Sequence, residues 1–355
     1  TARLGEMNEQ ISNAQRIVGD THVKAGDYDA SIAHYQQGIA SRGILNGENS
    51  SSVADGLVQV AHALSLEEED MLAIKELKRA LKIYRDTLGD ADEKVTLSVD
   101  EIASLYMTCE NYNKASAILE EVVKLKAANR GADHRSVADT LVLLVSAYEK
   151  SSQPDTALKS MKKAYKIYNE LGSETIAEAT DVLSRMAASY ESTSDHHRAA
   201  VAHLGVLRGQ KAMHSPENLV VGDAYYKLGC SLRQTGQHDK ALKCMKEALP
   251  LYISLTTEVD DASRIAEILR EMALINKEKD NHEDAVSLFK QELDVRRKLS
   301  QPNYPVIAKT LSHLGVSEYA LGNNTSALKY LVEALTILQD QGPDSVDCAE
   351  VLFHT

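Results

Sequence analysis

The feature of this sequence that most limits its fold is an internal repeat of 42 residues. A column of small residues recurs at that spacing at every step except one of 44 residues, between Ala241 and Ala285. A second column, small in all but one case, lies twelve residues before it, and a third lies seven residues after it. The first column comprises Ser31, Ala73, Ala115, Ala157, Ala199, Ala241, Ala285 and Ala327. A period of this length indicates a solenoid or a related array.

Between the columns, apolar residues fall at helical spacing, as in Leu141, Leu144, Val145 and Tyr148. No sustained alternation of apolar and polar residues predicts a strand. Each repeat is therefore predicted to be a pair of amphipathic helices, with small residues where the backbones approach closely. One pair cannot bury its apolar face alone, so neighbouring pairs must stack. The predicted fold class is all-α, an α-solenoid of about eight helix-turn-helix repeats.

Two stretches carry a family resemblance. GDYDASIAHYQQGIA (26–40) and YYKLGCSLRQTGQHDKALKCMKEALPLY (225–252) resemble the tetratricopeptide repeat (TPR) motif in their order of Gly, aromatic and small residues. The linkers RGADHRSVADTL and GPDSVDCAEVL, with the 42-residue period, are similar to the kinesin light chain and nephrocystin branch of that family. The resemblance implies a right-handed superhelix. It also implies that first helices line a concave groove that binds a protein or peptide.

The repeat register predicts a single TPR array over residues 1–355, with eight repeats over 12–341. Leu4-Gly5 stands where Leu88-Gly89 and Leu171-Gly172 end their second helices, and Gly is favoured just after a helix. Residues 1–11 are therefore expected to be the tail of a preceding repeat or a cap. Residues 342–355 are expected to start a ninth repeat or form a cap.

Composition excludes several classes of function. The chain has 39 Lys and Arg against 52 Asp and Glu, a net charge of −13, so its surface would repel nucleic acid. Its longest apolar run, LVLLV at 141–145, is far shorter than the roughly 20 residues of a membrane helix, so no membrane insertion is expected. The four cysteines form no CxxC pair, which indicates free thiols and a cytoplasmic location, with association with the cytoskeleton also considered.

The phrase SVAD occurs at 52–55 and again at 136–139, where His134 precedes it. His, Ser and Asp together suggest a catalytic group. The copies lie 84 residues apart, which is two repeats, and each stands where a first helix should begin. Ser at the N-cap with Asp three residues later fits a capping box, and Thr175 and Ser215 are predicted to cap in the same way. We therefore predict a structural role for the phrase.

Neither a metal site nor a cofactor site is predicted. The sequence has no glycine-rich phosphate-binding motif. The densest histidine cluster contains His196, His197 and His203, but zinc requires three or four convergent ligands. His196 shares a repeat column with Tyr28 and Tyr112, which indicates packing, and His203 falls in an apolar core column. The chain is therefore predicted not to be an enzyme.

What remains is a binding surface on the first helices of the later repeats. Its inward residues, carried over by column from the TPR resemblance, are Arg185, Tyr226, Lys227, Arg233, Arg270 and Lys277. Five cations beside a tyrosine suit an acidic or acidic-aromatic segment. The alternative is that these are solvated residues balanced by Glu267, Glu271 and Glu278.

The leading prediction is a non-catalytic interaction scaffold or adaptor that binds a peptide or helical segment of a partner protein in its concave groove. Two alternatives stay open. The array could be an architectural part of a cytoskeletal or motor-associated assembly, with self-association through its end repeats. It could also be the regulatory arm of an enzyme whose catalytic domain lies outside these residues.

Overall fold

The computed structural model describes residues 2–255, 262–299, 301 and 303–341. These residues form sixteen α-helices and one 3-10 turn, and none of them is in a strand. The chain divides into two compact units, Thr1–Thr175 (unit 1) and Ile176–Thr355 (unit 2). The predicted all-α solenoid of helix pairs is confirmed.

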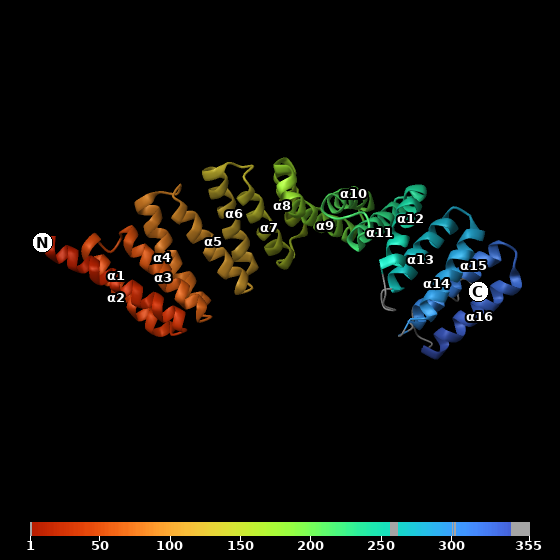
Figure 1. Ribbon diagram of the computed structural model, residues 1–355, viewed down its shortest axis with the longest axis horizontal. Helices are drawn as coiled ribbons and strands as arrows, with labels where there is room; N and C mark the ends of the chain where they lie inside the picture. Colours follow the sequence, from red (N-terminus) through yellow and green to blue (C-terminus); the bar gives the residue numbers. More distant parts are fainter. Residues whose placement is uncertain (1, 256–261, 300, 302, 342–355) are drawn as a thin grey trace. The chain divides into compact units, whose positions relative to one another are not determined.

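Unit 1 contains four helix pairs in which each helix packs against the helices before and after it (Figure 1). A 3-10 turn at Gly172–Thr175 follows the last pair. The helices are α1 (Ala2–Ala25), α2 (Tyr28–Asn46), α3 (Ser51–Leu66), α4 (Asp70–Leu88), α5 (Glu93–Thr108), α6 (Tyr112–Arg130), α7 (Arg135–Lys150) and α8 (Pro154–Leu171).

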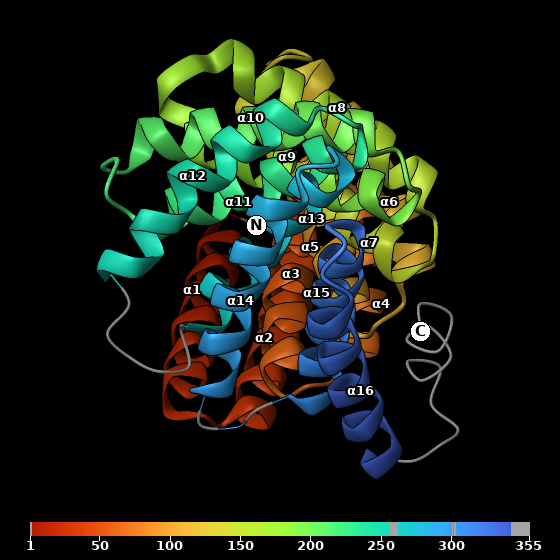
Figure 2. The same cartoon turned by 90° about the vertical axis from the view of Figure 1, so that its right-hand side faces the viewer.

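Unit 2 repeats the arrangement with four more pairs, which Figure 2 shows from a second side. Odd-numbered helices are the first and even-numbered helices the second members of their pairs. The helices are α9 (Ile176–Ser192), α10 (His196–Met213), α11 (Leu219–Gln234), α12 (His238–Leu255), α13 (Ala262–Glu278), α14 (His282–Arg297), α15 (Tyr304–Ala320) and α16 (Asn324–Gln341).

The turn inside each pair has the same backbone conformation in all eight pairs. One residue of the turn has a positive φ, between 54° at Glu110 and 80° at Gly322. A left-handed residue reverses the chain in a short connection, and glycine adopts it without steric cost. Three of the eight are Gly and five are other residues. They are Gly26, Glu68, Glu110, Ser152, Ser194, Gly236, Asp280 and Gly322.

The small-residue columns lie where the helices of a pair meet. Every member of the first column is at most 3 % exposed. In the second column, a Cβ added to Gly19 would lie 2.4 Å from the Tyr35 ring, and one added to Gly229 would lie 2.8 Å from Met245. The third column is also buried, and its charged member Glu292 is 0 % exposed. Close approach of backbones therefore explains the period.

The predicted serine caps of the SVAD copies are wrong. Helix α3 begins at Ser51, so Ser52 lies inside it, and α7 begins at Arg135, so Ser136 does too. The N-cap of α7 is His134, whose ring nitrogen accepts the Ser136 backbone N–H at 3.1 Å. Each helix thus begins one residue before the serine that the capping pattern placed at the N-cap.

Of the other two predicted caps, Ser215 is wrong in the opposite sense, because its helix begins after it, whereas Thr175 directly precedes α9 as predicted. Helix α11 begins at Leu219, and its cap is Asn218 rather than Ser215. The side chain of Asn218 accepts the Val220 N–H at 2.8 Å. Thr175 ends the 3-10 turn, where its hydroxyl donates to the Tyr168 carbonyl at 2.6 Å.

The glycines predicted to end second helices do so at Gly89, Gly131 and Gly172, each with a positive φ. Gly5 differs, because α1 runs through it without a break. Glycine inside a helix costs about 1 kcal/mol relative to Ala, which a long helix tolerates. The assignment of residues 1–11 to a preceding repeat or a cap stays a prediction, and residues 342–355 lie outside the described residues.

Candidate functional site

All six predicted binding residues lie on first helices of unit 2. We call the exposed surface of α9, α11, α13 and α15 the inner face. It is described below for unit 2 alone. The predicted residues are Arg185 on α9, Tyr226, Lys227 and Arg233 on α11, and Arg270 and Lys277 on α13.

Arg233 is held between two carboxylates of the next first helix. Its Nε donates to Glu271 at 2.8 Å and its Nη1 donates to Glu278 at 2.7 Å. The Arg233 and Glu271 side chains are only 16 % and 7 % exposed, whereas Glu278 is 38 % exposed. Burial opposes the charge of Arg233, but the two carboxylates raise its pKa above the ordinary value. The guanidinium is therefore fixed and fully charged.

The ring of Tyr226 contacts the guanidinium of Arg264, a residue that the sequence analysis did not predict to be part of the site. The guanidinium carbon of Arg264 is 4.8 Å from the centre of the Tyr226 ring, a cation–π contact. Arg264 also donates to Glu267 at 2.6 Å and lies 3.7 Å from Asp223. Its signal in the sequence was Glu267 three residues later on the same helix, since residues at that spacing face one another. Burial raises the pKa of the Tyr226 phenol far above its ordinary value.

Arg270 has a guanidinium that is only partly satisfied. Its Nη2 lies 3.7 Å from Glu271, and its Nε is buried without a hydrogen-bond partner among the described residues. The Arg270 side chain is 31 % exposed, so its outer nitrogens reach solvent. Arg270 therefore has donor capacity left for a ligand.

The remaining three predicted residues differ in how they are held. Lys227 is exposed, and no described residue forms an ion pair with it. Lys277 and Arg185 are half-buried, and each already interacts with another group of the protein. Within the described part of the face, α11 and α13 thus bring most of the predicted set together and Arg185 lies on a separate helix, α9.

The thiol of Cys230 on α11 is not activated as a nucleophile, and the described residues contain no metal-ligand cluster. Burial, followed by the charge of Glu271, raises the pKa of the Cys230 thiol to about 12, so the thiol stays protonated. Among the described residues, no three His, Cys, Asp or Glu side chains could hold a metal ion. His203 is 3 % exposed and bonded to Glu191 at 2.9 Å, in agreement with its core column.

The His134, Ser136 and Asp139 group does not form a triad. The Ser136 hydroxyl lies 2.9 Å from His134 Nδ1 at an exposed helix start. The Asp139 carboxylate accepts a hydrogen bond from Tyr168 at 2.7 Å instead. Without a carboxylate on its second nitrogen, the imidazole lacks the orientation that activates a serine.

None of the helices in the described part of the chain has an apolar stretch long enough to cross a lipid bilayer.

The fold and the inner face define an all-α helical-repeat protein of the kind that presents a surface to other proteins. Tetratricopeptide repeat models match residues 93–170, 222–251 and 264–352, which is more than half of the chain. The chain belongs to the tetratricopeptide repeat family. Proteins of this family generally mediate protein–protein interactions, and they are typically non-catalytic.

Kinesin light chain-related proteins of Arabidopsis thaliana are similar to this chain. Protein KINESIN LIGHT CHAIN-RELATED 1 is 22% identical over 345 residues, which cover 96% of this chain and 56% of the relative. Protein KINESIN LIGHT CHAIN-RELATED 2 is 22% identical over 345 residues, covering 94% and 50%. The chain therefore spans about half the length of the curated relatives it matches.

Two solved structures are also similar. Repeats of a putative kinesin light chain from Podosopora anserina are 17% identical, with a TM-score of 0.45, and cover 59% of this chain and 99% of that one. A Signal Transduction ATPase with Numerous Domains protein with a tetratricopeptide repeat sensor, from Pyrococcus horikoshii, is 16% identical, with a TM-score of 0.47, covering 94% and 49%.

Proposed function

We propose that this chain is a non-catalytic scaffold that binds an acidic or acidic-aromatic segment of a partner protein on the inner face of unit 2. The binding residues are those predicted from the sequence, centred on α11 and α13, with Arg264 added. Family membership supports the general role in protein–protein interaction. The choice of face and of ligand charge rests on the geometry of Arg233.

The observation that carries the proposal is the unequal pair of carboxylates on Arg233. Glu271 is buried and fixes the guanidinium from one side, while Glu278 is half-exposed and occupies the other side at 2.7 Å. Glu278 is the last residue of α13, where the helix dipole disfavours a negative charge. A partner carboxylate can therefore take the place of Glu278 without disturbing Glu271.

Two neighbouring groups complete the proposed site. Arg270 offers its exposed nitrogens to a second carboxylate, and Lys227 adds an exposed charge with which no described residue forms an ion pair. The half-buried Tyr226 ring and the Arg264 guanidinium stacked on it give a flat surface for an aromatic side chain of the ligand. Because the charges are exposed, their contribution is screened within about 10 Å at 0.1 M salt.

The test is binding of full-chain protein to an array of acidic-aromatic peptides, with basic and scrambled versions of each, followed by calorimetry on the hits. We expect acidic hits whose affinity falls as salt rises. Lys227→Gln and Arg270→Gln should each weaken binding. Glu278→Gln should tighten it by about threefold, since the competing pair is worth less than about 1 kcal/mol.

Lys246→Gln, at an exposed position on α12 away from the inner face, is the matched control and should leave binding unchanged. If Glu278→Gln weakens binding, or if Arg270→Gln has no more effect than Lys246→Gln, the site is wrongly assigned. Equal binding of basic peptides would reject the ligand class.

A cytoplasmic location is part of the same proposal. The described cysteines Cys109, Cys230 and Cys244 are free thiols. Free thiols are typical of a reducing compartment. Oxidation state mapped by mass spectrometry on protein from its natural source tests this, and a disulfide among these three would contradict it.

A further inference from the structure

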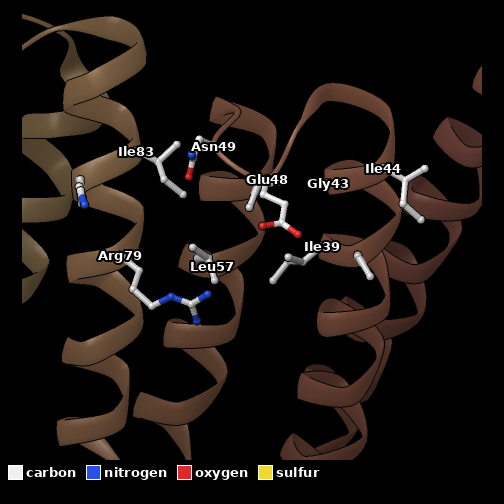
Figure 3. A pocket seen from close by; sticks show the side chains of 11 residues that line it. Ile39, Gly43, Ile44, Glu48, Asn49, Leu57, Arg79 and Ile83 are labelled. Carbon is white, nitrogen blue, oxygen red and sulfur yellow. The ribbon is translucent and has the colours of Figure 1, made fainter.

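Unit 1 has a groove between two of its second helices, lined by both apolar and polar side chains. It lies between α2 and α4, with α3 as its floor, and has a volume of about 740 Å³. A smaller hollow of about 370 Å³ continues it and shares Ile39, Leu57 and Arg79. Ile39 and Ile83 face the space from opposite walls, and Arg79 extends across it towards Leu57 (Figure 3). We call this the outer groove.

The outer groove exists because α2 departs from the repeat pattern on its exposed side. Its wall carries Ala40, Gly43 and Ile44. In the repeat columns of Ala40 and Gly43, the next second helix, α4, has Lys82 and Arg85. A Cβ added to Gly43 would meet nothing closer than 3.7 Å, so packing does not require a glycine there.

Ile44 is a second residue at which α2 departs from the repeat pattern. The corresponding residues of the other second helices are polar, charged or alanine, whereas Ile44 is an isoleucine that is 78 % exposed. Together with Ile39 and Ile83 in the same lining, Ile44 forms a contiguous apolar patch, and such patches are typical of interaction sites. The residues in its column are Asp86, Ala128, Glu170, Ala212, Ser254, Lys298 and Asp340.

The floor sets the length of the ligand. Val53, Leu57, Val60 and Leu64 follow one face of α3 at helical spacing. Val53, Leu57 and Val60 are at most 6 % exposed, so this face gives the groove its length while the side chains of its walls supply most of the accessible apolar surface. At a rise of 1.5 Å per residue, these positions span roughly 16 Å, or about three turns of helix. A ligand helix of about 12 residues therefore matches the full length of the floor.

The α4 wall sets the charge of the ligand. Lys82 is exposed, and no described residue forms an ion pair with it. Arg79 is 61 % exposed and pairs with Glu76 at 2.5 Å, while Glu76 itself is only 17 % exposed. In a chain with a net charge of −13, this wall is a basic surface, whereas the exposed Glu48 lines the groove on the side of α2. A ligand helix with carboxylates on the side facing α4 is complementary to it.

We propose that the outer groove of unit 1 binds an amphipathic helix of a partner protein, about three turns long, that lies along α3 with its apolar face against Ile39, Ile44 and Ile83 and with carboxylates facing Lys82 and Arg79. The groove is independent of the inner face of unit 2. The chain would then hold two partner segments at once. A second copy of this chain is disfavoured as the occupant because two such acidic molecules repel each other.

The test is a selection from a displayed library of helical peptides about 12 residues long. The bait is the full chain, with counter-selection against Gly43→Arg. This substitution places at Gly43 the residue that α4 carries in the same column, and it should improve helix propensity. Circular dichroism verifies that the variant is folded. We expect enriched peptides with apolar residues at positions i, i+4 and i+7 and with flanking Asp or Glu.

Binding of the selected peptides should fall at least about tenfold in Gly43→Arg and in Ala40→Lys. The separate variant Lys82→Glu should weaken binding by a larger factor than either. Ala127→Arg, at the same repeat column on α6, is the matched control and should have no effect. Lys227→Gln and Arg270→Gln on the inner face should also have no effect, which separates this proposal from the proposed function.

Three results would overturn the proposal. They are an absence of enriched peptides, enrichment of basic helices, and equal binding to Gly43→Arg and the original chain. Sedimentation velocity excludes self-association as the explanation. A dimer of the original chain that Gly43→Arg dissociates would assign the groove to a second copy instead.

Discussion

The hydroxyl of Tyr168, at the end of α8, donates a 2.7 Å hydrogen bond to the carboxylate of Asp139, at the start of α7. The same bond joins the ends of two other pairs, Tyr84 to Asp55 at 2.6 Å and Tyr252 to Asp223 at 2.5 Å. Burial and the carboxylate raise the pKa of Tyr84 and Tyr252 far above the ordinary value, so these phenols remain donors. The carboxylates of Asp55, Asp139 and Asp223, at the same repeat position of three first helices, thus tie the two helices of their pairs together.

Tyr168→Phe removes one of these ties and leaves the ring in place. We expect a loss of about 1 to 2 kcal/mol in the free energy of unfolding, because the lost donor bonded a charged acceptor. Urea unfolding followed by circular dichroism measures it. The control is Tyr165→Phe on the same helix, because the Tyr165 hydroxyl makes only a 3.5 Å hydrogen bond, to Asn169, among the described residues. It should cost less than about 0.5 kcal/mol. Equal losses for the two variants would contradict a role for the Asp139 bond.

Gly209 lets α10 approach α9, because a Cβ there would lie 1.9 Å from the Thr180 hydroxyl. Gly209→Ala should therefore destabilise the protein by about 1 to 3 kcal/mol. Thr180→Ala in the same molecule removes the clash, so a double-mutant cycle should give a favourable coupling energy. Gly43→Ala, where space is available, should be neutral or stabilising. Additive effects of the Gly209 and Thr180 changes would show that the contact does not limit helix approach.

The left-handed turn residues give a pair of opposite predictions. Glu110 has a φ of 54° and is exposed, so Glu110→Gly should stabilise the protein by about 0.5 to 1 kcal/mol by relieving backbone strain. Gly236 has a φ of 72° in the equivalent turn, so Gly236→Ala should destabilise it by about 1 kcal/mol although no atom obstructs the Cβ. Thermal unfolding measures both. A shift of the two midpoints in the same direction would refute the shared turn conformation.

Glu292 occupies a column of small residues and is fully buried, with hydrogen bonds to Arg296 at 2.6 Å and Thr310 at 3.0 Å. Burial raises the pKa of this carboxyl above its ordinary value, although Arg296 and Thr310 oppose the shift. A carboxyl with a higher pKa in the folded state binds its proton more tightly there. Its contribution to stability is therefore present below the unfolded pKa, about 4.3, and is lost as pH rises through the folded pKa.

Glu292→Gln keeps the shape of the side chain and cannot titrate. We expect the free energy of unfolding of the original chain, minus that of the variant, to fall as pH rises above about 4.3. Urea unfolding at a series of pH values measures the difference. A difference that is constant or rises with pH would show that the ion pair with Arg296, rather than burial, controls the titration.

The 42-residue period was enough to predict the helix pairs, their small-residue contacts and the glycine turns, because close packing of two helices depends on residues at fixed spacing. It was also enough to place all six predicted binding residues on first helices. It could not place helix starts to within a residue, so His134 and Asn218 cap where Ser136 and Ser215 were expected.

The sequence by itself determined the fold class and which faces of the helices are buried, since both follow from local periodicity. Only the tertiary structure decided how charges pair between helices. Arg233 meets Glu271 and Glu278, which follow it by 38 and 45 residues, and Arg264 covers Tyr226 from the next pair. The outer groove also depends on the tertiary structure, because the missing side chain at Gly43 opens a hollow only where α4 and α3 surround it. These distances depend on how neighbouring pairs stack, which no single repeat contains.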